Sequence, residues 1–377
     1  MNINEIIVYV MTGFMVVGAI DKCLNNRFGL GQHFDEGFMA MGPLAIAVVG
    51  VVSLAPALAS VLEPLVVPIY TMLGADPAMF AATLLANDMG GYPLAMELAQ
   101  SQEAGLFAGL IVSTMMGATV VFNIPVALSI IKKEDHPYLA LGVMLGLICV
   151  PVGCLAAGLV AGFEPAMVLK NLTPIVLVSL LLILGLWKIP EKMMYGFEKF
   201  GRGVSILITV GTAAAVFEAL TGIVVIPGMA PVWDGLKLVG AIGIVLLGAF
   251  PMVQVMMKVL KGPLLRIGGL LKINDTATGG LLMTLANAIP MFDLVKDMGP
   301  KGKVMNFAFV VTAGYALGDH LGFTAGVDRQ MIFPMVTGHL VAGITALVVA
   351  KIVLRHETLL TPRKPMVQES VKSPAVL

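Results

Sequence analysis

The chain has 377 residues, of which 58% are hydrophobic and 12% are charged, and its 23 lysines and arginines balance 23 aspartates and glutamates. Soluble domains carry about 25% charged residues, so this composition excludes an ordinary soluble protein and indicates an integral membrane protein. The zero net charge argues against a nucleic-acid partner, and the three cysteines lack metal-ligand spacing, so we expect neither a metal nor a cofactor.

Long, nearly uncharged runs recur along the chain, and most approach the roughly 20 residues that a spanning helix needs. No basic stretch precedes the first run, so we interpret it as a retained span and not as a signal peptide. We predict an all-α polytopic membrane protein with about 9–11 transmembrane helices in one transport domain, residues 1–356. A disordered cytosolic tail follows at 357–377. The nine clearest spans are 6–20, 37–62, 104–131, 138–163, 171–187, 203–233, 238–257, 304–325 and 330–350.

Two further segments, 64–98 and 263–298, do not fit a simple spanning helix. Each begins with a proline, Pro64 or Pro263, turns, and then returns through a Leu-Ala-Asn phrase. Short apolar segments interrupted by proline or glycine at matching positions point to the binding site of a transporter. We therefore predict two broken or re-entrant hairpins that enter and leave on the same side of the membrane. Full crossings by both hairpins would give eleven spans instead.

Matching residues about 200 positions apart indicate an internal duplication. Asn87 and Asn287 are 200 apart, and Phe122 and Phe323 are 201 apart. We place repeat one at about 37–163 and repeat two at about 238–350. An odd number of spans separates their first helices, so the second copy should be inverted, as in many secondary transporters.

The distribution of lysine and arginine predicts the orientation. With the N-terminus outside and the C-terminus in the cytosol, most of the 23 basic residues fall inside. Only Lys170, Lys237 and Arg329 fall outside, and Arg266 and Lys272 lie within the second hairpin. Because basic residues gather on the cytoplasmic side, this bias supports a multi-pass protein of the bacterial cytoplasmic membrane, embedded in the lipid bilayer.

The first candidate binding residues lie at the Leu-Ala-Asn phrases. Asp88 lies within an apolar stretch, where an ionisable group is costly and usually functional. It follows Asn87 and precedes Tyr92, whose ring could face a cation. The matching position in the second repeat offers Asn287, an amide that can donate and accept hydrogen bonds. The alternative is that both asparagines merely cap broken helices.

A second polar group lies at Tyr315, Asp319 and His320. On a helix, Tyr315 and Asp319 would share a face at i, i+4 spacing, so the phenol could steady the carboxylate. His320 would point about 100° away and serve a separate contact. A proton-coupling role for His320 and a purely structural one both stay open.

Several longer phrases resemble the EutH family, the ethanolamine permeases of bacterial ethanolamine-utilisation operons. The resemblance runs from about residue 1 to 355. It implies a membrane protein that brings ethanolamine inward for breakdown by a cobalamin-dependent lyase in a microcompartment. It supplies no assignment of binding residues. The phrases that carry it are 84–91, 285–287 with 289–292, 318–323, 36–42 and 189–193.

Ethanolamine is mostly an ammonium ion at neutral pH and carries one hydroxyl group. We expect Asp88 and Asp319 to hold the ammonium, and Asn287, with His320 as a further candidate, to bind the hydroxyl. A passive channel for small amines is the main alternative. An intramembrane aspartyl enzyme fits poorly, since the stretch before Asp319 lacks the first glycine of Gly-x-Gly-Asp. Energy coupling is left open, as is assembly into a homo-oligomer.

Overall fold

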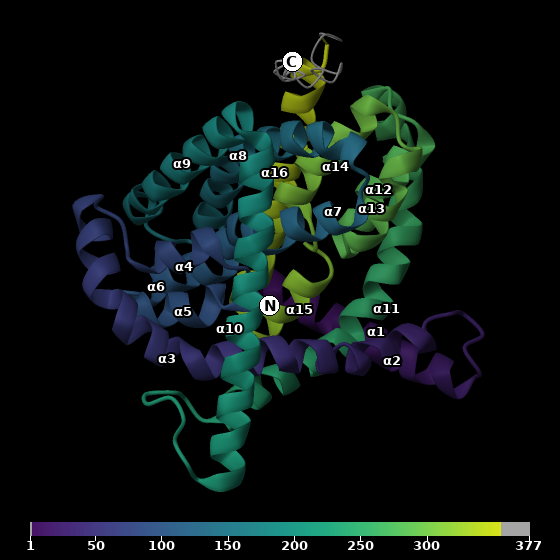
Figure 1. The fold of residues 1–377 in the computed structure, drawn as a ribbon. Helices are drawn as coiled ribbons and strands as arrows, with labels where there is room; N and C mark the ends of the chain where they lie inside the picture. The colour runs from purple at the N-terminus through teal and green to yellow at the C-terminus, as the bar shows by residue number, and fades with distance from the viewer. Residues whose placement is uncertain (1, 356–377) are drawn as a thin grey trace, which may run out of the picture.

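The computed structural model describes residues 2–355, and within them the regular elements are all helices. Eight helical segments are long and apolar enough to cross a membrane. The prediction of an all-α polytopic membrane protein is therefore confirmed (Figure 1). The predicted tail at 357–377 lies outside the described residues. The eight segments are Ile3–Cys23, Gly31–Met72, Gln102–Ile130, Lys133–Val160, Pro165–Lys188, Pro190–Thr221, Val232–Pro263 and Arg329–Val353.

Two very long helices, α3 (Met41–Met72) and α11 (Val232–Leu271), pack against each other. Pro64 and Pro263 lie inside them, so our prediction that these prolines begin new hairpin arms is wrong. A proline removes one backbone hydrogen bond, and in an apolar environment continuing the helix best satisfies the remaining polar groups. Before α3 come the helices α1 (Ile3–Cys23) and α2 (Gly31–Met39).

A helix broken at the Leu-Ala-Asn phrase follows each long helix, as the sequence predicts. After α3, the helix α4 (Ala78–Leu84) ends before a 3-10 turn at Asn87–Met89 and α5 (Gly91–Leu98). After α11, the helix α12 (Asp275–Ala286) is followed by α13 (Ile289–Leu294) and a 3-10 turn at Val295–Asp297. Entry and exit of these segments on one side of the membrane stays a prediction.

The helical segment that follows each of these breaks is continuous in the first half and divided in the second. The first runs from α6 (Gln102–Leu106) through π-helical turns to α7 (Ile124–Ile130). The second divides into α14 (Pro300–Ala313) and α15 (Asp319–Val327), so the predicted continuous span at 304–325 is wrong. The helix stops because the residues between α14 and α15 form backbone hydrogen bonds to α12 instead.

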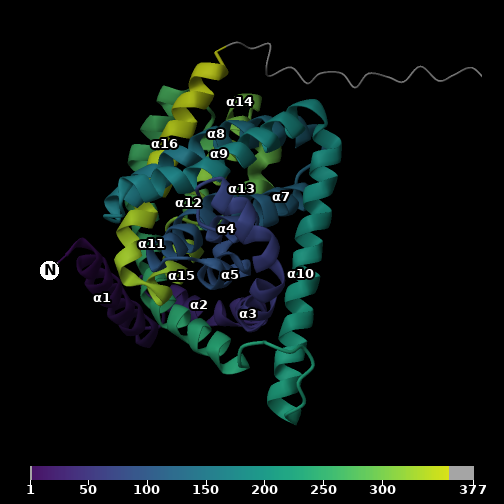
Figure 2. The same ribbon diagram turned by 90° about the vertical axis from the view of Figure 1, so that its left-hand side faces the viewer.

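A group of long helices surrounds these broken elements. α8 (His136–Val160) packs against α9 (Pro165–Lys188), α14 and α16 (Ile332–Val353), whereas α10 (Pro190–Thr221) packs against α3 and α7. In Figure 2, α10 and α16 lie on opposite edges, and α4, α5 and α15 lie between them. In this view (Figure 2), α4, α5 and α15 therefore lie among continuous helices. Short 3-10 turns at Lys133–Asp135 and Arg329–Met331 precede α8 and α16.

The elements come in the same order in the first half, residues 41–160, and in the second half, residues 232–353. Each half begins with a long helix, continues through a break at Leu-Ala-Asn and a second helical segment, and ends with α8 or α16. This shared order supports a duplication. An inverted relation between the two halves stays a prediction.

Candidate functional site

A cavity of about 50 Å³ lies where the broken helices of the two halves meet. A water-sized group needs about 10–15 Å³, so the cavity has room for roughly three to five such groups. It therefore suits a very small solute. The lining consists of Ala86, Asp88, Ala118 and Phe122 from the first half and Tyr315, Asp319 and His320 from the second.

Asp88 reaches this cavity because the chain unwinds after α4. Leu85 and Ala86 are extended, with ψ of 138° and 153°. Gly90 has φ +111°, a conformation that glycine adopts far more readily than other residues. The chain turns back there, and the N–H of Gly91 donates to the carbonyl oxygen of Ala86 at 2.7 Å. Asp88 is left between two short helices, half-buried, with its side chain at the cavity.

The break between α14 and α15 places Tyr315 and Asp319 at the same cavity. The backbone there differs from the one that we predicted. We expected one helical face, but the segment between α14 and α15 is not helical, and Tyr315 has φ +60°. The Tyr315 N–H donates to the Thr284 carbonyl at 2.9 Å, and the Leu317 N–H donates to the Leu285 carbonyl at 2.8 Å. These bonds replace the lost helical ones and join the two breaks of the second half.

The cavity is acidic. Asp88 and Asp319 come from opposite halves, and their carboxyl groups are close enough for their charges to repel each other. Among residues 2–355, no lysine or arginine forms an ion pair with either one. An uncompensated buried charge costs several kcal/mol. The start of α15 offsets part of this cost at Asp319, because a helix N-terminus favours negative charge. A bound cation would offset more.

Polar atoms of Tyr315 and His320 have only poorly aligned backbone contacts, with Ala288 and Gly314 respectively, and so keep hydrogen-bonding capacity for a ligand. The Tyr315 hydroxyl and the His320 Nδ1 are buried, and neither has a well-formed hydrogen bond within the described part of the chain. Buried polar groups are normally paired, so two open ones at a single cavity need an explanation. A small solute with a hydrogen-bonding group would supply the missing partner.

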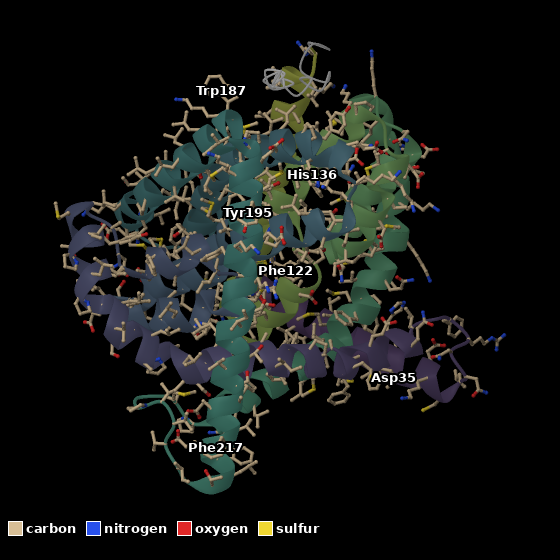
Figure 3. The ribbon with its side chains drawn as sticks, viewed as in Figure 1. Asp35, Phe122, His136, Trp187, Tyr195 and Phe217 are labelled. Carbon is tan, nitrogen blue, oxygen red and sulfur yellow. The ribbon has the colours of Figure 1, made fainter. Side chains whose placement is uncertain are left out.

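Two aromatic rings form part of the wall. Phe122 and Tyr315 meet edge to face with their ring centroids 6.0 Å apart, one from each half. Figure 3 shows Phe122 near the centre of the molecule. Aromatic faces attract a cation within about 6 Å of the ring centroid, so this pair adds to the cation preference of the carboxylates. Phe122 entered the sequence analysis only as a repeat match, because a phenylalanine in an apolar run carries no other signal.

His339 is a second residue that the sequence analysis missed. It is fully buried on α16, and its ring centroid lies 5.4 Å from that of His320. Its Nδ1 is 2.8 Å from the Thr312 carbonyl oxygen, so Nδ1 carries the proton, and its Nε2 is 3.0 Å from Thr114 Oγ1. His339 thus ties α16 to both halves behind His320. A lone histidine in the apolar run 330–350 was the available signal.

Three predicted residues do not line the cavity. Tyr92 packs edge-on against Phe323, with centroids 5.8 Å apart. Asn87 is fully buried, and its amide has no hydrogen-bond partner within the described residues. Asn287 is exposed, and its Oδ1 accepts from the N–H of Ile289 at 2.9 Å in a local turn before α13, whose N-cap is Ala288. A binding role for these three stays a prediction.

The fold and the cavity define a polytopic helical membrane protein with an acidic internal site shared by two similar halves. The chain belongs to the EutH family: the family model described as "Ethanolamine utilisation protein, EutH" matches residues 3–353. The chain is 59% identical to a "Probable ethanolamine permease EutH" of Listeria monocytogenes, over 93% of this chain and 94% of the relative.

Two further relatives cover nearly the same length. A protein of Bacillus subtilis named "Uncharacterized protein YxeR" is 50% identical over 92% of this chain and 94% of its own. A "Probable ethanolamine permease EutH" of Escherichia coli is 46% identical over 95% of this chain and 97% of its own. No solved structure matches this chain.

Proposed function

We propose that this protein transports ethanolamine across the bacterial cytoplasmic membrane, with its N-terminus outside and its C-terminus in the cytosol. Relatives from Listeria, Salmonella and Escherichia that carry the name probable ethanolamine permease support the substrate. The hydrogen bond from the Phe333 N–H to Asn4 Oδ1 supports termini on opposite sides of the membrane, because it joins the beginnings of the first and last spans. Those two ends must lie on one side if the first and last spans are to run in the same direction. The distribution of lysine and arginine supports an N-terminus outside.

The pair of carboxylates at the cavity is the single observation that carries this proposal. Asp88 and Asp319 hold the ammonium group between them, and the Phe122 ring covers it. Within residues 2–355, no lysine or arginine lines the cavity, and the substrate itself supplies the positive charge. The cavity has room for roughly three to five water-sized groups, enough for two carbons, an amine and a hydroxyl.

The hydroxyl of ethanolamine binds to Tyr315 and His320, which line the same cavity. The Tyr315 hydroxyl can donate to it, and the open nitrogen of His320 can accept from it or donate to it. Asn287 would serve this hydroxyl only after a rearrangement of the turn that it forms with Ile289. The site therefore distinguishes ethanolamine from ethylamine by hydrogen bonding.

Transport proceeds by alternating access, in which one group of helices, with the binding site at its breaks, moves against the other. Residues from both halves contribute to one cavity, as expected when a binding site lies at a repeat interface. The broken helices are the moving part and the long helices α3, α8, α10 and α16 are the frame. A passive channel would instead show uptake that never saturates with ethanolamine concentration.

Uptake of labelled ethanolamine by cells that produce Asp88→Asn or Asp319→Asn tests the proposal. Each variant keeps the shape of the side chain and removes its charge, so we expect the initial rate to fall by tenfold or more. Asp293→Asn is the matched control, since Asp293 is exposed and away from the cavity. Normal saturable uptake by both Asp88→Asn and Asp319→Asn, at wild-type protein levels, would overturn the assignment.

A further inference from the structure

A second and larger cavity, of about 230 Å³, lies between α1, α11 and α15. Its walls are mostly apolar, with Val8, Met11 and Met15 from one side of α1 facing Ile244 and Val245 of α11. The Thr12 hydroxyl, which also lines it, already donates to the Val8 carbonyl at 2.8 Å. At about 10–15 Å³ for each water-sized group, this second cavity has room for roughly fifteen to twenty-three of them. It is therefore too large for the small amine proposed for the first cavity.

One cation, Arg329, stands among these apolar walls. Its side chain is exposed, and its guanidinium has no ion pair or hydrogen bond to any residue within 2–355. The neighbouring carboxylate of Asp328 instead accepts from the N–H of Gln330 at 2.8 Å. An arginine presents a rigid fork of donors that matches a phosphate group.

The position of Arg329 along the spans adds a second argument. The Asn2 side chain donates to Gln330 Oε1 at 3.3 Å, and the Asn4 Oδ1 accepts from the Phe333 N–H at 2.9 Å. Two candidate spans, α1 and the segment that ends in α16, therefore begin together at Arg329. From there the cavity follows α1 from Val8 to Met15, about 10 Å along the helix at 1.5 Å per residue.

We propose that this cavity binds one anionic phospholipid, with its phosphate on Arg329 and an acyl chain along α1. An arginine at the end of a transmembrane helix can bind the phosphate of an anionic lipid through its fork of donors. The bound lipid would fill a space that the protein leaves open beside α1, which is weakly buried. It would also pack against Ala325 on α15, the helix whose first residues Asp319 and His320 line the substrate cavity. The lipid site stands whether or not ethanolamine is the substrate.

Thermal unfolding of the purified full-length protein in a neutral detergent tests the lipid site. Added phosphatidylglycerol should raise the melting temperature, whereas phosphatidylcholine and soluble glycerol phosphate should not. Arg329→Gln should weaken the effect so that about fivefold more phosphatidylglycerol is needed for the same rise. Lys170→Gln is the matched control, because Lys170 is exposed and outside the cavity.

A second pair of variants tests the apolar part. Thr12→Trp places a large ring in the cavity and should abolish the rise in melting temperature that phosphatidylglycerol causes. Gly13→Trp, at the next position, projects into open space and should preserve that rise. Equal stabilisation of wild type and Arg329→Gln by phosphatidylglycerol would overturn the proposal. So would equal stabilisation by phosphatidylcholine or by glycerol phosphate. Conversion of a dimer into a monomer by Thr12→Trp would assign the surface to a second copy of the chain instead.

Discussion

Gly117 and Gly318 occupy matching positions in the two halves, and each lies against a carbonyl oxygen of a Leu-Ala-Asn phrase. A Cβ atom on Gly117 would lie 1.9 Å from the Leu85 oxygen, and one on Gly318 would lie 2.0 Å from the Ala286 oxygen. In both halves, therefore, a glycine lets one segment cross another at its break. The residues just beyond each crossing line the substrate cavity.

Alanine at either crossing should disrupt the site. Gly117→Ala or Gly318→Ala must push backbone away from backbone, so we expect a loss of stability of about 1–3 kcal/mol or more and a collapse of uptake. Gly279→Ala on α12 is the control, because a Cβ there meets nothing within 4 Å. Melting temperature and uptake should be measured together. Wild-type melting temperature and uptake in both variants would show that the segments do not approach each other this closely at Gly117 and Gly318.

Substrate selectivity follows from the open polar atoms of Tyr315 and His320. Ethylamine has the ammonium but not the hydroxyl, so it leaves those atoms unpaired and should compete with ethanolamine at least tenfold less well. Tyr315→Phe should bring the inhibition constants of the two amines closer together, mainly because it weakens the binding of ethanolamine. Competition assays with labelled ethanolamine measure both effects. Equal inhibition by ethylamine and unlabelled ethanolamine in the wild type would remove the hydroxyl from the recognition scheme.

His339 should matter for stability more than for charge recognition. His339→Ala breaks two buried polar contacts, to Thr312 and Thr114, and should cost about 2–4 kcal/mol. Thr114→Val removes only one of them and should cost about half as much. Unfolding in detergent gives the comparison. If His339→Ala has the stability of the wild type but no uptake, His339 acts directly in transport and its role is not structural.

Topology can be tested with cysteines. Cys23 is exposed at the end of α1, whereas Cys149 and Cys154 are buried. With the N-terminus outside, Cys23 faces the cytosol, so an impermeant maleimide should label it only in opened membranes. In a Cys23→Ser background, Val225→Cys, in the exposed segment between α10 and α11, should be labelled in intact cells. The reverse pattern would invert the assignment.

The sequence allowed some of these features to be predicted and hid others for physical reasons. Asp88, Asp319, Tyr315 and His320 stand out because polar groups are rare in apolar runs, and all four line one cavity. The breaks at the two Leu-Ala-Asn phrases were likewise predicted from the sequence. Phe122 gave no such signal, because an aromatic residue in an apolar run has the same appearance whether it faces lipid, core or ligand.

The errors in the predicted helices have two causes. Pro64 and Pro263 were interpreted as helix starts, but a long apolar helix tolerates an internal proline. The break before Asp319 was missed because it depends on Tyr315 and Leu317 donating to carbonyl groups of α12. Hydrogen bonds between distant segments leave no trace in local periodicity, so the predicted i, i+4 pairing of Tyr315 with Asp319 was wrong.

Equilibrium binding of ethanolamine to the purified protein, followed by calorimetry, tests most directly whether Asp88 and Asp319 form one cation site. We predict that Asp88→Asn and Asp319→Asn each weaken binding by tenfold or more, and that Asp293→Asn leaves it unchanged. We also predict that the double variant is far less than additive, since the two carboxylates share one ligand. Unchanged affinity in both single variants would contradict the account.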